Sequence, residues 1–201
     1  GSVRRTAQIP LRGALDDQVE EVCMQAARSL TRSWTEAGFS ERRDAVLVAG
    51  RLSDQASADG DGFSWFAHEV VPRLVERIPW ARVRVAGAHP PEAMAALSSP
   101  SMQFMGRMSD FARLYGSARV AIAPMRPGSD ANLKAVAALL HGVPLVTTTW
   151  GAERIDLLGH PAIDVADDPA GFANRLATLL DDAAAWNQRR ESLRGLLAGW
   201  E

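Results

Sequence analysis

The stretch "PMRPGSDANLK" (residues 124–134) contains a glycine turn whose features can bind phosphate. Gly128 lets a backbone turn approach a ligand closely, and Lys134 supplies a positive charge. A helix beginning directly after such a turn offers free N–H groups to an anion. Asp130 stands where that anion would dock, and its carboxylate would repel a phosphate by about 1–4 kcal/mol at ~4 Å. We therefore interpret Asp130, with Ser129, as the N-cap of a helix over residues 131–141, in place of an anion.

Six short apolar segments, most of them ended by Gly, Pro or Asp, predict the strands that position this turn. They cover residues 44–50, 81–87, 102–106, 118–124, 143–148 and 162–166. Helical spacing of apolar residues predicts helices over residues 63–78, 110–117, 131–141, 169–180 and 184–197. The alternation predicts an α/β fold, a doubly wound Rossmann-like parallel sheet of about six strands with helices on both faces.

Two further expectations concern the start of this alternation. The small, polar residues 52–62 predict a loop that leaves the first strand. In and after the first helix, Trp65, Phe66 and Trp80 are expected to pack in the core.

The N-terminal segment predicts an amphipathic helix over residues 15–37, because its apolar residues recur at steps of three and four. We assign residues 1–41 to a helical segment or linker that packs on the domain, and residues 42–201 to the Rossmann-like domain. The alternative is a helix that binds a partner. A start at Gly1-Ser2 without an initiator Met predicts a fragment of a longer protein.

Composition excludes several classes of protein. With 22 basic and 24 acidic side chains the chain has no electrostatic footprint for nucleic acid, and only the pairs Arg42-Arg43 and Arg189-Arg190 cluster. One cysteine excludes an internal disulfide framework, and no pair of histidines has metal-ligand spacing. No apolar run of about 18 residues is present. We expect no transmembrane segment and a cytoplasmic protein, either free or at a membrane surface.

Residues that can contact a ligand follow the predicted strands, where doubly wound sheets bind their ligands. The first strand is followed by Arg51, and the third ends at Gly106 and Arg107. The fifth is followed by Trp150, which can stack on a base or a sugar, and by Glu153.

From about residue 42 onward these motifs, in this order, resemble the C-terminal, nucleotide-sugar-binding half of a GT-B-fold group 1 glycosyltransferase. The matching pieces are "VLVAGRL", "MQFMGRMSDFARLYGSARVAIAPMRPGSDANLK" and "GVPLVTTTWGAERI". The resemblance implies that a missing N-terminal domain holds the acceptor, which is a glycan, lipid or protein. It also implies a nucleotide-diphosphate sugar as donor, with no metal and no other cofactor.

The resemblance implies a role for each donor-site residue. Arg51 would contact the diphosphate, and the backbone N–H groups of residues 128–132 would bind the phosphates. Gly106 and Arg107 would lie near the base, and Glu153 matches a glutamate common in this branch. The implied substrate-binding set is Arg51, Gly106, Arg107, Gly128, Ser129, Asp130, Asn132, Lys134, Trp150 and Glu153. No catalytic residue can be named from the sequence.

The donor motif is degenerate. Ser129 and Ala137 stand where the family usually carries two glutamates, and Asp130 and Asn132 replace a glycine and a lysine. Two hypotheses therefore remain: a donor-binding half of a transferase, or a catalytically degenerate domain that acts as a scaffold or protein-interaction module. Under either hypothesis the isolated fragment is expected to be inactive, because transfer needs both halves around donor and acceptor.

Overall fold

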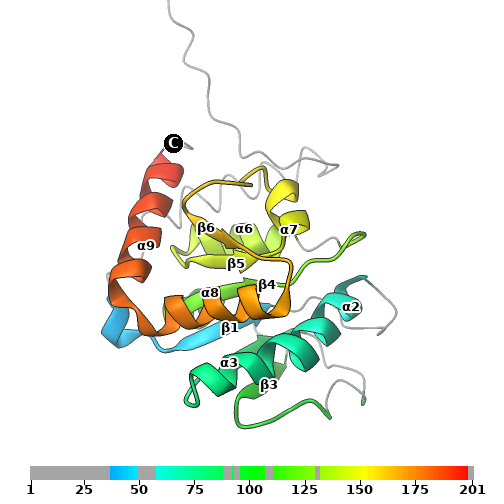
Figure 1. Cartoon of the computed structure of the whole chain (residues 1–201). Coiled ribbons are helices and arrows are strands. Elements are labelled where there is room, and N and C mark those ends of the chain that lie inside the picture. Colours follow the sequence, from blue (N-terminus) through cyan, green and yellow to red (C-terminus); the bar gives the residue numbers. More distant parts are fainter. Residues whose placement is uncertain are drawn as a thin grey trace, which may run out of the picture.

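The computed structural model describes residues 37–48, 58–87, 92, 96–106, 111–129 and 132–198 (Figure 1). Within these ranges, the side chains of residues 47–48, 111–112 and 132–134 are not described. The helix predicted over residues 15–37 lies outside the described part except for its last residue, and of the proposed N-terminal segment 1–41 only residues 37–41 are described.

The core of the fold is a six-stranded sheet in which every pairing is parallel. Its strands are β1 (Asp44–Val48), β2 (Val83–Ala86), β3 (Met102–Gly106), β4 (Ala118–Ala123), β5 (Leu145–Thr147) and β6 (Ile163–Val165). The order across the sheet is β3-β2-β1-β4-β5-β6. The predicted Rossmann-like sheet is therefore confirmed, and its strand order reverses between β1 and β4.

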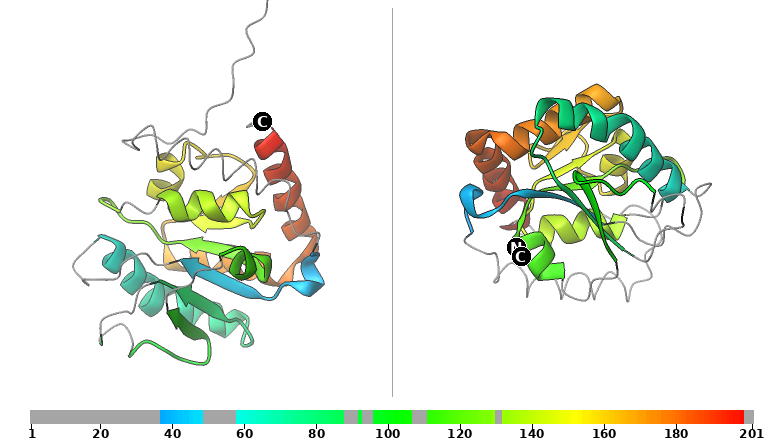
Figure 2. Two further views of the ribbon diagram at one scale, coloured as in Figure 1. Left: turned by 180° about the vertical axis from the view of Figure 1, so that it is seen from behind. Right: turned by 90° about the horizontal axis from the view of Figure 1, so that it is seen from below.

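Helices cover both faces of the sheet, as Figure 2 shows from below. One face carries α2 (Ala58–Trp65), the π-helical segment η3 (Phe66–Val70), α3 (Val71–Arg77) and α8 (Pro169–Asp181). The other carries α5 (Phe111–Gly116), α6 (Asn132–Leu140), α7 (Thr149–Arg154) and α9 (Ala183–Ala198). The short 3-10 helix η2 (Phe39–Glu41) precedes β1.

Alternate side chains of the strands belong to two hydrophobic cores, one on each face of the sheet, because successive side chains of a strand point to opposite faces. Ala45 and Val146 belong to the core under α3 and α8. Their neighbours Val46 and Leu145 belong to the core under α6 and α9. Strands buried on both faces need apolar residues at nearly every position, which explains the continuous apolar runs of the sequence.

Two expectations from the sequence are wrong. Residues 58–62 are helical rather than part of a loop, and α2 begins at Ala58. Gly62 allows this helix to pack directly on the loop after β4, since a Cβ there would lie 2.1 Å from the carbonyl oxygen of Pro124. Trp80 is 49% exposed rather than part of the core, because it lies in the turn between α3 and β2.

The buried Tyr115 predicts a loss of stability at alkaline pH. It is the single tyrosine of the chain and is 1% exposed, with its ring stacked on that of His141 at a centroid distance of 5.0 Å. Burial raises the pKa of its phenol. Above pH ~10 the unfolded chain releases this proton while the folded chain keeps it, so stability falls as pH rises.

We expect tyrosinate absorbance to appear only when the chain unfolds. Urea titrations between neutral pH and about pH 11, in parallel with Tyr115→Phe, isolate the contribution of the phenol. The comparison is needed because burial and the charge of Arg190 lower the pKa of Arg42 to about 10, which gives the opposite slope. A phenol that titrates near pH 10 in the folded chain would contradict the expectation.

Candidate functional site

The candidate site lies where the strand order reverses, between β1 and β4, at the carboxyl ends of the strands. The loop after β4 meets the beginning of α2 here. Gly128 has a φ of +93°, a conformation that favours glycine, and a Cβ on it would lie 3.4 Å from the Cβ of Ala58. Two segments about seventy residues apart in sequence therefore form one wall of the site.

Ser129 joins these two segments through a short hydrogen bond. Its hydroxyl donates to Oδ1 of Asp59 at 2.5 Å, and its side chain is 3% exposed. This bond joins Ser129 to α2, and the residues between Ser129 and Asn132 of α6 are not described, so the predicted capping role of Ser129 stays a prediction. Asp130 lies outside the described residues, so its predicted role stays a prediction.

Arg126 places a positive charge at the same wall. Its Nε lies 3.5 Å from Oδ2 of Asp61, and its guanidinium carbon lies 4.8 Å from the centre of the Trp65 ring. Nε is buried and makes no hydrogen bond within the described part of the chain, while the side chain as a whole is 34% exposed. The guanidinium is thus held on one side by a ring and a carboxylate and is open to solvent on the other.

The site residues predicted from the sequence omit Arg126, Asp59 and Asp61. Arg126 lies three residues after the end of β4, so its place at a strand end was a usable signal. For the two aspartates there was none, because the stretch around them has the composition of a loop.

Helix α7 is fastened to the ends of β4 and β5 by threonine hydroxyls. Thr148 donates to the carbonyl oxygen of Met125 at 2.6 Å and accepts from the backbone N–H of Gly151 at 3.2 Å, which caps the helix. Thr147 donates to the carbonyl oxygen of Ala123 at 2.8 Å. These bonds fix the direction in which α7 leaves the sheet.

Trp150 and Glu153 both lie on α7, as the sequence places them after the fifth strand. Trp150 is half-buried, and its Nε1 is buried with no hydrogen-bond partner among the described residues. The guanidinium carbon of Arg154 lies 5.6 Å from the centre of its ring. Glu153 is exposed.

The other predicted residues are placed only in part. Gly106 ends β3 with a φ of +69°, and its carbonyl oxygen accepts from the backbone N–H of Gly87. Asn132 and Lys134 lie in the first turn of α6, and their side chains are not described. Arg51 and Arg107 lie outside the described residues.

The described ranges contain no group of three or more His, Cys, Asp or Glu side chains that could hold a metal ion. None of the helices that the structure describes is both long and apolar enough to cross a membrane.

The sheet order and the glycine turn at its reversal define an α/β domain of the Rossmann-like class. Residues 43–182 match the family model described as "Glycosyl transferases group 1". The chain belongs to this family. No curated protein sequence matches it.

Solved structures similar to this chain include C-terminal domains of glycosyltransferases. The C-terminal CMP-Kdo binding domain of WaaA from Acinetobacter baumannii is 12% identical with a TM-score of 0.57, over 88% of this chain and 98% of that one. The C-terminal domain of LpcC, a group 1 family protein from Francisella tularensis, is 14% identical with a TM-score of 0.58, over 84% and 90%. Both confirm the fold.

A longer similar structure is Anabaena Alr3699/HepE in complex with UDP and glucose. It is 14% identical, with a TM-score of 0.59, over 87% of this chain and 47% of that one. The chain therefore spans about half the length of this longer protein and nearly the whole of the isolated C-terminal domains.

Proposed function

We propose that this chain is the donor-binding half of a group 1 glycosyltransferase. Its donor would be a nucleotide sugar, the class to which CMP-Kdo and the UDP of the similar proteins point. The observation that carries the proposal is the Gly128 turn, which leads into α6 at the reversal of the strand order with the Arg126 guanidinium beside it.

In this proposal the site stabilises the negative charge of the leaving nucleotide. Transfer breaks the bond between the anomeric carbon and the phosphate oxygen, and the acceptor oxygen forms the new bond as it loses its proton. Arg126 would contact a phosphate oxygen, and the N-terminus of α6 would offer backbone N–H groups to another. Trp150 would stack on the base or the sugar. Arg51, Lys134 and Glu153 remain proposed contacts from the sequence.

Asp61 affects how Arg126 can bind a phosphate. It lies 3.5 Å from the Nε of Arg126, so a phosphate at the solvent-open side of the guanidinium would share this charge with Asp61 unless Asp61 moves. With 65% of its side chain exposed, Asp61 can turn toward water when the donor binds. We therefore propose that the donor replaces Asp61 as the partner of Arg126.

The proposal extends to the rest of the protein. The acceptor, a glycan, lipid or protein, would be held by a further domain, and transfer would require both domains around the donor. No metal is needed if guanidinium groups and the helix N-terminus balance the charge of the leaving group. We place the protein in the cytoplasm or at a membrane surface.

Calorimetric titration with UDP, GDP, CMP and their sugar conjugates tests the donor site. We expect saturable binding of one nucleotide that is weakened about ten- to a hundredfold by Arg126→Ala, the cost of one charged hydrogen bond. Arg51→Ala tests the residue predicted from the sequence. Arg77→Ala is the matched control, because Arg77 is exposed at the end of α3.

The control variant should bind as the unchanged chain does. If no nucleotide binds, and Asp130→Gly with Ala137→Glu restores binding, the fold has been kept while its donor chemistry has been lost. The chain would then be a scaffold or protein-interaction domain.

A further inference from the structure

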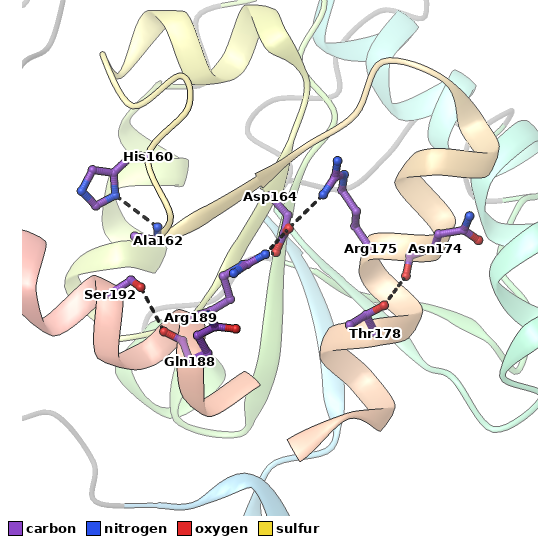
Figure 3. A network of polar contacts seen from close by, with 9 residues as sticks. All are labelled: His160, Ala162, Asp164, Asn174, Arg175, Thr178, Gln188, Arg189 and Ser192. Carbon is purple, nitrogen blue, oxygen red and sulfur yellow. Dashed lines mark hydrogen bonds and ion pairs between the residues drawn. The ribbon is translucent and has the colours of Figure 1, made fainter. Parts of the chain in front are cut away.

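A groove of about 320 Å³ lies between α8, α9 and the edge strand β6, apart from the strand-order reversal. Asp164 of β6, Arg175 and Thr178 of α8, and Arg189 of α9 line it, together with the apolar Leu179. Figure 3 shows Arg175 and Arg189 approaching Asp164 from opposite sides. No residue of the candidate donor site lines this groove.

Asp164 is an acidic residue in the centre of a strand and is only 6% exposed. Its Oδ1 accepts from Nη1 of Arg175 at 3.1 Å and from Nη2 of Arg189 at 2.9 Å, and its Oδ2 accepts from Nε of Arg189 at 2.8 Å. The hydrogen bonds that Arg189 donates to Asp164 raise the pKa of its guanidinium.

The positive charge of the groove is only half balanced. One carboxylate faces two guanidinium groups, and each of these has five N–H donors. Within the described part of the chain, neither arginine makes a hydrogen bond to any group other than Asp164. The side chain of Arg175 is 45% exposed and that of Arg189 is 27% exposed, so a molecule in the groove can reach them.

A structural role accounts for each arginine as the link from its own helix to β6, but not for the N–H donors that both leave unused. A single Arg–Asp pair already joins α9 to β6 through two hydrogen bonds. Burying a carboxylate costs stability unless it is paired, and an apolar residue at this strand position would avoid that cost. The second guanidinium, that of Arg175, is the more exposed of the two and adds further N–H donors, and guanidinium donors recognise carboxylates and phosphates.

We propose that this groove binds a small organic anion, a molecule with a phosphate or a carboxylate group, between Arg175 and Arg189. The volume lies at the lower end of the range for small-molecule sites, about 300–1,000 Å³. Ala185, which is partly exposed, provides an apolar contact for the remainder of the molecule. Arg189 is one of the clustered arginines of the sequence that the donor site does not use.

Calorimetric titration of the chain with inorganic phosphate, glycerol phosphate and lactate tests the proposal and separates a phosphate from a carboxylate ligand. We expect saturable binding of glycerol phosphate or of lactate. Arg175→Gln should weaken it about tenfold or more, the cost of a charged hydrogen-bond pair. Arg77→Gln, which removes the same charge from an exposed position on α3, should leave it unchanged.

The variant Asp164→Asn should have the opposite effect on the affinity for the anion. Without the carboxylate both guanidinium groups need an anion, so the variant should bind the same probe more tightly and gain more thermal stability from it than the unchanged chain does. An excess of UDP should not displace the probe, which separates this groove from the proposed donor site.

The proposal is overturned if no organic anion binds saturably, or if Arg175→Gln and Arg77→Gln weaken binding equally. It is also overturned if Asp164→Asn folds but neither binds the probes more tightly nor gains more thermal stability from them than the unchanged chain does. If that variant does not fold even with the anion present, the comparison of the two arginine variants decides.

Discussion

Trp186→Ala lowers the free energy of unfolding by about 3–5 kcal/mol, the cost of removing a large buried aromatic side chain. Trp186 is fully buried, and its Nε1 donates to the carbonyl oxygen of Arg119 at 2.7 Å. Its ring also meets that of Phe39 at a centroid distance of 5.7 Å. Alanine would leave a cavity between α9 and the segment that leads into β1.

Two buried guanidinium groups increase this cost. The guanidinium carbons of Arg42 and Arg190 lie 5.7 and 4.8 Å from the centre of the Trp186 ring, and the two side chains are 0% and 6% exposed. Both donate to the carbonyl oxygen of Ala37. Without the ring, two like charges would lie near each other with less to balance them.

Urea titration monitored by far-UV circular dichroism measures the effect. Trp80→Ala is the matched control, because Trp80 is 49% exposed and its removal should cost less than about 1 kcal/mol. Equal losses from the two variants would mean that α9 is not fastened to the sheet through Trp186.

Gly62→Ala lowers the free energy of unfolding by about 3 kcal/mol, because helix α2 must move away from the loop after β4. The new methyl group would lie 2.1 Å from the carbonyl oxygen of Pro124, which is backbone and cannot turn aside. The movement would also separate Asp59 from Ser129 and Asp61 from Arg126. Nucleotide affinity should therefore fall together with stability.

Gly195→Ala is the control for this substitution, since Gly195 also lies inside a helix but a Cβ on it meets nothing within 4 Å. Alanine there should raise stability by about 0.5–1 kcal/mol through its helix propensity. Both variants are compared by urea titration, and the Gly62 variant also by calorimetry with the nucleotide that the unchanged chain binds. A Gly62 variant as stable as the Gly195 variant would show that α2 does not rest on the loop.

The sequence by itself determined the class of fold and indicated the edge of the sheet at which the candidate site lies. Most strands are short, mainly apolar runs between turn residues that alternate with helical segments, a pattern typical of a doubly covered parallel sheet. All six strands were therefore located within a few residues of their observed ends. Residues at strand ends such as Gly128 and Trp150 could be placed for the same reason.

Only the tertiary structure decided which of these elements touch. The start of α2 at Ala58, the bond between Ser129 and Asp59, and the pairing of Asp164 with two arginines depend on contacts between distant segments. Local periodicity indicates which side of an element is apolar, but not which partner that side meets. That choice follows from the strand order, which brings β1 and β4 together and with them α2 and the loop that leads into α6.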